Sequence, residues 1–186
     1  MVRLCEIFKD PAAYAGPIQV SGWVRTVRDS KAVGFIELAD GSSFKNVQVV
    51  YAQDAIDPQV KKQLCTGCAI SVTGTLELTP EAKQPFEIQA QAIAIEGACQ
   101  SDYPLQKKRH TLEYLRTIQH LRPRANLFQC AFRVRSLAAQ AVHRFMHDKG
   151  FVYVHTPLIT GSDCEGAGEM FQVTTLDLNN VPKTED

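Results

Sequence analysis

The stretch IQVSGWVR, residues 18–25, alternates apolar and polar side chains. A period of two is typical of a β-strand that buries one face and exposes the other. Segments of similar character follow at residues 34–38, 47–51, 68–78 and 86–95, and turn signals such as Asp40-Gly41 separate them. The sequence therefore predicts five β-strands within its first hundred residues.

A short helix is expected between the third and fourth of these strands. Asp57-Pro58 opens it, because proline is tolerated in the first turn of a helix. Five strands with one small helix between the third and the fourth are the pattern of an OB-fold barrel, which binds oligonucleotides on the face of its second and third strands. We assign residues 1–100 to this domain, although the fold alone does not decide a function.

The chain changes character after this domain. Residues 101–126 contain Pro104 and Pro123, and we expect a hinge with one helical turn near residues 112–115. The segment from Ser101 to Arg135 contains two acidic residues and eight basic residues. The basic residues are at positions 107, 108, 109, 116, 122, 124, 133 and 135. Such a stretch can contact phosphates. It is equally compatible with a solvated linker.

A helical period begins where the hinge ends. Apolar residues recur at three- and four-residue steps between Leu127 and Phe145. Asn126 is the expected N-cap and Gly150 the expected stop. A strand over residues 151–155, ended by Pro157, should follow. Residues 127–186 thus form a second domain, and the whole chain falls into the α+β class.

Bulk composition excludes several classes of protein. The 186 residues carry 20 basic and 20 acidic side chains, so net charge gives no support for nucleic-acid binding. No apolar run approaches the roughly 18 residues of a membrane span. Residues 1–20 show no secretory signal. We expect a cytoplasmic protein without membrane contact.

The six cysteines predict no disulfide. Cys65-Thr-Gly-Cys68 is a CxxC motif, but neither a second pair nor histidines at ligand spacing accompany it, so no metal site is expected. Two reduced cysteines beside a strand are the simplest interpretation. A redox role is the alternative, although the βαβ context of redox CxxC motifs is missing.

Several motifs in one order carry a family resemblance. Residues 144–157, RFMHDKGFVYVHTP, resemble the first signature motif of class II aminoacyl-tRNA synthetases, and residues 162–171, SDCEGAGEMF, resemble the amino-acid-binding loop of their aspartyl/asparaginyl branch. Residues 22–31, 108–116 and 120–124 are similar to bacterial-type asparaginyl-tRNA synthetases. The second and third class II motifs are absent. The chain therefore resembles the N-terminal part of such an enzyme: an anticodon-binding barrel, a hinge and the opening of an antiparallel-sheet catalytic domain.

The resemblance implies an ATP-dependent ligase. Asparagine would be activated to asparaginyl-adenylate and transferred to tRNA(Asn), with Mg²⁺ bridging the phosphates. The ATP and Mg²⁺ sites would lie mostly outside this chain, which we expect to be inactive alone, and no catalytic residue is assigned within it. The family resemblance also implies a homodimer, with Gly150, Phe151 and Pro157 at its interface.

The resemblance also assigns residues to two binding sites. In the loop, Glu165 would accept the α-ammonium of the amino acid, Gly166 and Gly168 would let the loop move, and Glu169 would order it. Without the resemblance the same loop is an acidic surface loop. In the barrel, Phe35 would stack on an anticodon base, Arg28 and Gln48 would bond base edges, and Arg25 would contact phosphate. The pattern alone would place Phe35 in the barrel core instead.

Two alternatives remain open. An aspartyl-type or non-discriminating synthetase shares most of these motifs, although the loop usually reads EGARDF in the aspartyl form and EGAGEMF here. A non-catalytic, truncated tRNA-binding paralogue would contain the same barrel and a dimerising helix.

Overall fold

The computed structural model describes residues 2–82, 84–100, 102–159, 161, 171 and 173–183. The chain forms two compact units, Met1–Arg133 and Val134–Asp186. The first unit contains the barrel, the hinge and the opening turns of a long helix. The three-part division expected from the sequence, with boundaries after residues 100 and 126, remains a prediction.

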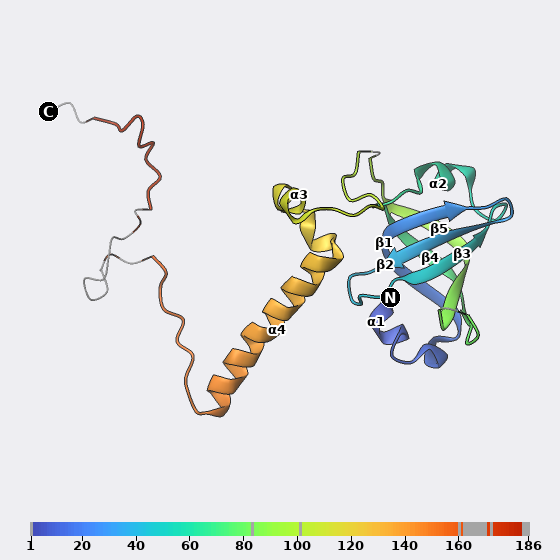
Figure 1. The fold of residues 1–186 in the computed structure, drawn as a ribbon, viewed down its shortest axis with the longest axis horizontal. Coiled ribbons are helices and arrows are strands. Elements are labelled where there is room, and N and C mark those ends of the chain that lie inside the picture. Colours follow the sequence, from blue (N-terminus) through green and yellow to red (C-terminus); the bar gives the residue numbers. More distant parts are fainter. Residues whose placement is uncertain are drawn as a thin grey trace. The chain divides into compact units, whose positions relative to one another are not determined.

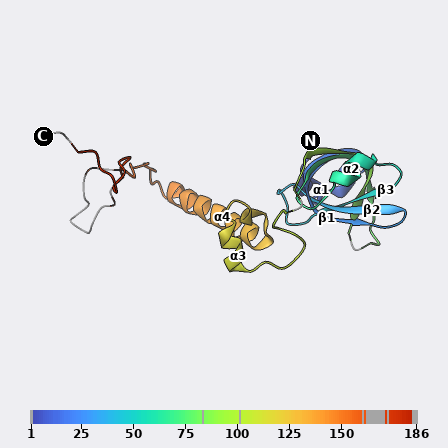
Figure 2. The same cartoon turned by 90° about the horizontal axis from the view of Figure 1, so that it is seen from above.

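Five strands form a closed barrel in the order β1-β2-β3-β5-β4 (Figures 1 and 2). They are β1 (Gly16–Asp29), β2 (Val33–Ala39), β3 (Val47–Ala52), β4 (Ala69–Leu78) and β5 (Phe86–Gly97). The long strand β1 closes the barrel, because its first half pairs with β4 and its second half with β2. Only the β3–β5 pairing is parallel. All five predicted strands are confirmed, with ends that differ by a few residues.

Alternation along the strands fills the barrel with apolar side chains. The buried core includes Ile18, Val20 and Val24 of β1 together with Ile36 and Leu38 of β2, and Leu38 pairs with Val24. The predicted short helix is α2 (Pro58–Gln63), and the Asp57 carboxylate caps it by accepting from the Gln59 amide at 2.7 Å.

Two short N-terminal elements were not predicted. They are α1 (Leu4–Ile7) and the 3-10 helix η1 (Pro11–Tyr14). Leu4 and Ile7 are fully buried in the barrel core, and the Leu4 amide donates to Asp40 Oδ2 at 2.8 Å. A four-residue helix is too short to show a period, and its stability comes from this tertiary packing.

The hinge contains the expected helical turn. It forms α3 (Leu112–Thr117), which Thr111 caps by accepting from the Tyr114 amide at 3.2 Å, and Leu115 is buried. The 3-10 helix η2 (Arg122–Arg124) follows. The hinge is therefore a connection with its own short helices rather than a structureless linker.

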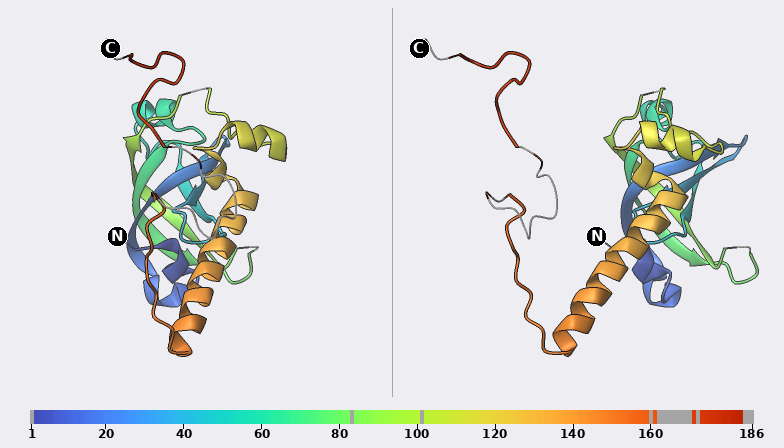
Figure 3. Two further views of the ribbon diagram at one scale, coloured as in Figure 1. Left: turned by 90° about the vertical axis from the view of Figure 1, so that its left-hand side faces the viewer. Right: turned by 60° about the vertical axis from the view of Figure 1, so that its left-hand side comes forward.

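The predicted long helix is α4 (Asn126–Asp148), which both views in Figure 3 show as one uninterrupted element. It begins at Asn126 itself, and Gly150 ends it with a φ of +84°. The strand expected over residues 151–155 is not formed. A strand needs a partner for its ladder, and no described residue pairs with this segment. Among the described residues no helix is long and apolar enough to cross a membrane.

Candidate nucleic-acid interface

The register of β1, β2 and β3 places two rows of side chains next to one another. Phe35 lies opposite Arg28 on one side and Val50 on the other. In the next row, Glu37 lies between Thr26 and Gln48. Side chains directly opposite in an antiparallel pair have Cβ atoms about 4.5–5.5 Å apart. Three predicted base-contacting residues, Arg28, Phe35 and Gln48, thus share one surface, which we call the reading face.

The reading face points away from the barrel interior. Along β2, buried Gly34, Ile36 and Leu38 alternate with half-buried residues, and Phe35 is one of the latter. Phe35 is not a member of the core cluster. Arg28 is exposed and Gln48 is half-buried. The core interpretation of Phe35 is therefore excluded.

A buried tyrosine stiffens one end of this surface. Tyr51 is only 2% exposed, and its hydroxyl donates to Asp29 Oδ1 at 2.5 Å. Burial first, and the hydrogen bond to Asp29 second, raise the pKa of Tyr51 well above its ordinary range. A Cβ at Gly34 would lie 2.1 Å from the Tyr51 ring, so only glycine lets β2 pass over it. Gly34 precedes Phe35, so this contact fixes the backbone that carries Phe35.

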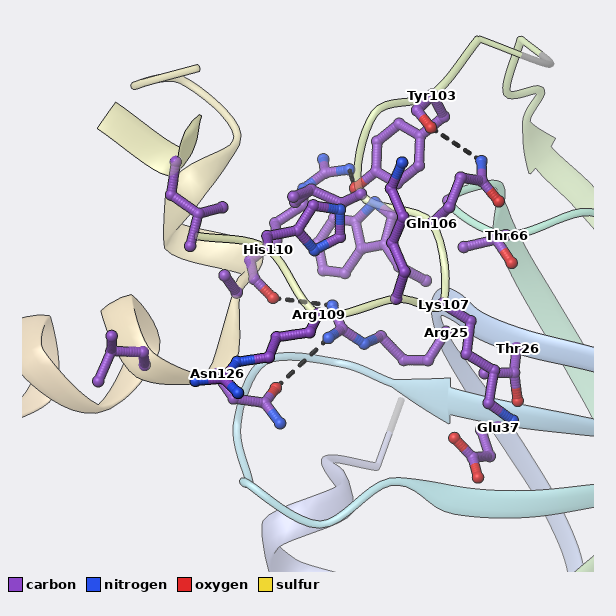
Figure 4. Close-up of a pocket in the computed structure, with 18 of the residues that line it drawn as sticks. Arg25, Thr26, Glu37, Thr66, Tyr103, Gln106, Lys107, Arg109, His110 and Asn126 are labelled. Atoms are coloured by element: carbon purple, nitrogen blue, oxygen red, sulfur yellow. Dashed lines mark hydrogen bonds between the residues drawn. The ribbon is translucent and has the colours of Figure 1, made fainter. Parts of the chain in front are cut away.

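A pocket of about 1030 Å³ lies beside the reading face, between β1 and the hinge (Figure 4). Trp23 and Tyr103 line it, and the Arg124 guanidinium lies 5.3 Å from the centre of the Trp23 ring. Its basic lining residues are Arg25, Lys107, Lys108, Arg109 and Arg124, against the acids Glu37 and Glu113. This excess of positive charge beside aromatic rings favours a nucleic-acid strand.

Arg25 holds the hinge against the barrel. Its guanidinium donates to the Arg124 carbonyl oxygen at 2.8 Å and to Asn126 Oδ1 at 3.4 Å (Figure 4). Arg25 therefore lies in the pocket rather than in the two rows of the reading face. Its phosphate contact remains a prediction that would use its remaining N–H donors.

The start of α4 is also tied to the barrel. Arg133 lies over the Phe44 ring at 4.9 Å and donates to the Gly41 carbonyl oxygen. Together with Arg25, this contact fixes the opening turns of α4 next to the pocket. Arg25 and Arg133 therefore each donate to a backbone oxygen that lies about a hundred residues away in the sequence.

The other predicted site residues lie elsewhere. Glu165, Gly166, Gly168 and Glu169 fall outside the described residues, so the amino-acid-binding loop remains a prediction. Phe151 is 64% exposed. Gly150 and Pro157 are exposed as well, on either side of it in the chain.

Some residues of the interface were missed from the sequence. Glu37 could have been predicted, because the period of two places it on the same side of β2 as Phe35. Nothing in the sequence indicated that Trp23, Tyr103 and Arg124 meet, because they come from β1 and from two distant parts of the hinge. Among the described residues no group of three or more His, Cys, Asp or Glu side chains could hold a metal ion.

Two family models match the chain. Residues 18–96 match the OB-fold nucleic acid binding domain, and residues 111–181 match the class II tRNA synthetases of the D, K and N type. The first match covers the barrel with its reading face. The second begins at α3 and covers α4.

Curated relatives agree over nearly the whole chain. The asparagine–tRNA ligase of Desulfitobacterium hafniense is 60% identical over 97% of this chain. That of Clostridium kluyveri is 64% identical over 91% of it. The chain spans only 39% and 36% of the length of these two relatives.

Solved structures share the fold. Asparaginyl-tRNA synthetase from Pyrococcus horikoshii, complexed with asparaginyl-adenylate, superposes with a TM-score of 0.74 at 20% identity, over 87% of this chain and 38% of that one. The enzyme of Entamoeba histolytica gives 0.68 at 22% identity, over 81% and 37%. The barrel and both family models agree with these likenesses, and over nearly its whole length this chain matches the N-terminal part of the asparagine–tRNA ligases.

Proposed function

We propose that this chain forms the anticodon-reading part of an asparagine–tRNA ligase. The observation that carries the proposal is the cross-strand register that brings Arg28, Phe35 and Gln48 onto one exposed surface of the barrel. An aromatic ring flanked by hydrogen-bonding side chains suits an unstacked RNA base, which needs a π-surface and partners for its edges.

Each residue of the reading face has a distinct part in this proposal. Phe35 stacks on one anticodon base, while Arg28 and Gln48 bond base edges from the neighbouring strands. Arg25 and the exposed residues 107–109 attract the phosphate backbone beside them. The name of the curated relatives, asparagine–tRNA ligase, supports asparagine as the amino acid and tRNA as the partner.

For the whole protein we propose the reaction implied by that name. Asparagine attacks the α-phosphate of ATP to give asparaginyl-adenylate and pyrophosphate, and a tRNA(Asn) hydroxyl then accepts the asparaginyl group in the cytoplasm. Glu165 would hold the α-ammonium of asparagine. The described residues contain no ligand cluster for a metal ion. Mg²⁺ therefore has no fitting site among them.

We also propose that the protein is a homodimer. Several large apolar side chains of α4 are more than half exposed: Leu127, Val134, Leu137, Val142 and Phe145. A helix with an unburied apolar stripe of this kind needs a partner surface. A second copy is the partner that the family resemblance implies, with Gly150, Phe151 and Pro157 at the contact.

The test is a titration of this chain, at fixed salt, with two anticodon stem-loops. They differ only in the third anticodon letter, GUU for asparagine and GUC for aspartate. Tighter binding of GUU, lost in Gln48→Ala or Arg28→Ala, supports an asparagine-specific reading face. Equal binding of both loops, unchanged by either substitution, contradicts it and leaves an aspartyl-type barrel or unspecific attraction to phosphates.

A further inference from the structure

The CxxC motif has a third thiol beside it. Cys65 and Cys68 enclose a tight turn, in which the Cys68 amide donates to the Cys65 carbonyl oxygen at 3.2 Å and Gly67 has a φ of +96°. The β4–β5 ladder starts with Ala69 opposite Gly97, which brings Cys99 next to this turn. None of these cysteines belongs to the reading face.

Cys65 and Cys99 are in contact beside this turn. Cys65 Sγ is 3.6 Å from the Cys99 carbonyl oxygen. Burial first, and the neighbouring Cys65 thiol after it, raise the pKa of the Cys68 and Cys99 thiols. A Cβ at Gly67 would lie 2.9 Å from Cys99 Sγ, so the turn packs tightly on that sulfur. Cys65 is thus the central thiol of the cluster.

Burial distinguishes the two partners of Cys65. Cys68 is fully buried, whereas Cys65 and Cys99 are both partly exposed. Burial raises the pKa of the Cys68 thiol and, as the largest cause, that of Cys99 as well. A small reagent in solution can therefore reach Cys65 and Cys99 but not Cys68.

We propose that Cys65 and Cys99 form a thiol-modification site. A low-molecular-weight disulfide oxidises the two thiols, which then form an intramolecular Cys65–Cys99 disulfide. Both thiols are free in the structure. The sequence singled out only the CxxC pair. The third thiol, 34 residues after Cys65 in the chain, is brought to it by the fold.

The chemistry balances in two exchange steps. The Cys65 thiolate attacks one sulfur of a disulfide R–S–S–R, which forms a Cys65–S–S–R mixed disulfide and releases one RS⁻. The Cys99 thiolate then attacks the Cys65 sulfur, which forms the Cys65–Cys99 bond and releases the second RS⁻. The chain loses two hydrogens, and the reagent is reduced to two thiols. Because the pKa of Cys99 is raised, the second step should accelerate as the pH rises.

The disulfide would join the loop before β4 to the residues that connect β5 with the hinge. Cys65 lies between α2 and β4, and Cys99 lies just beyond β5. Tyr103 packs on the same turn, since a Cβ at Gly67 would lie 2.8 Å from its ring. Oxidation should therefore slow hydrogen exchange at residues 98–100 and 102–103, while the strands of the reading face exchange as before.

The experiment uses the whole chain in its native state with glutathione disulfide at mildly alkaline pH. Free thiols are then alkylated, and peptides are mapped by mass spectrometry without reduction. The expected product is one linked pair, Cys65–Cys99, with the loss of two hydrogens. Cys65→Ser and Cys99→Ser should each abolish it, and Cys130→Ser, at an exposed cysteine of α4, should leave it unchanged.

A second measurement guards against a folding defect in the variants. The same oxidation of the unsubstituted chain in denaturant should give mixed pairings, because the fold no longer selects the partner. A Cys65–Cys68 bond in the native chain, glutathione adducts without a protein disulfide, or no oxidation would each overturn the proposal. None of these outcomes depends on the proposed anticodon function, which the stem-loop titration tests separately.

Discussion

Replacing Phe35 with alanine should weaken RNA binding strongly and folding only slightly. Phe35 is half-buried on the outer side of β2, between Arg28 and Val50, and stands outside the core cluster. Stacking of one base on an aromatic ring is worth about 1–3 kcal/mol. Removing a stabilisation of that size raises the dissociation constant of an anticodon stem-loop roughly 5- to 150-fold.

The matched control is a phenylalanine that faces inward. Phe86 at the start of β5 is 1% exposed and belongs to the core. Phe86→Ala should cost about 3–5 kcal/mol of the free energy of unfolding, as buried phenylalanines do. Phe35→Ala should cost about 1 kcal/mol or less, because a side chain on the outer face buries little apolar surface.

Two assays on the same samples separate the effects. Fluorescence anisotropy of a labelled GUU stem-loop gives the dissociation constant, and urea unfolding gives the stability. If Phe35→Ala destabilised the barrel as much as Phe86→Ala, the outward orientation of Phe35 would be wrong. If it left both quantities unchanged, the stacking role would have to be withdrawn.

Three further predictions concern other parts of the first unit. Tyr51 stays protonated in the folded state because its pKa is raised. Its contribution to the free energy of unfolding is complete below the ordinary tyrosine pKa of about 10 and decreases as the pH rises above that value. Urea unfolding should show a smaller alkaline loss in Tyr51→Phe. Gly41 and Gly67 both have positive φ, but of these two only a Cβ at Gly67 would meet other atoms. Gly67→Ala should therefore lower the free energy of unfolding by more than the about 1–2 kcal/mol expected for Gly41→Ala. Equal losses of stability in urea unfolding would contradict the close packing at Gly67. Glutamine at residues 107–109 should reduce the slope of log affinity for tRNA against log salt by about 0.7 for each phosphate that is no longer neutralised, and an unchanged slope would show that the pocket does not bind phosphate.

The amino-acid pattern predicts the architecture of the barrel, and the family resemblance adds the candidate reading residues. Each strand alternates between core and surface, and this period is a local property that survives without knowledge of the fold. The helix α4 followed from its apolar period, and Gly150 marked its end. The motifs that resemble the synthetases depend on residue identity at fixed spacing, and for this reason they can be recognised from the sequence alone.

The pairing of the strands determines which side of the barrel wall Phe35 occupies and what lies beside it. A period of two says that neighbours alternate, but it does not say which set faces inward; the pairing of β2 with β1 and β3 does. The pocket could not be foreseen, since Trp23, Tyr103 and Arg124 are far apart in sequence. The failure of residues 151–155 to form a strand has the same origin, because a strand exists only when a partner supplies its hydrogen bonds. Local patterns therefore fixed the elements, and long-range contacts fixed their surfaces.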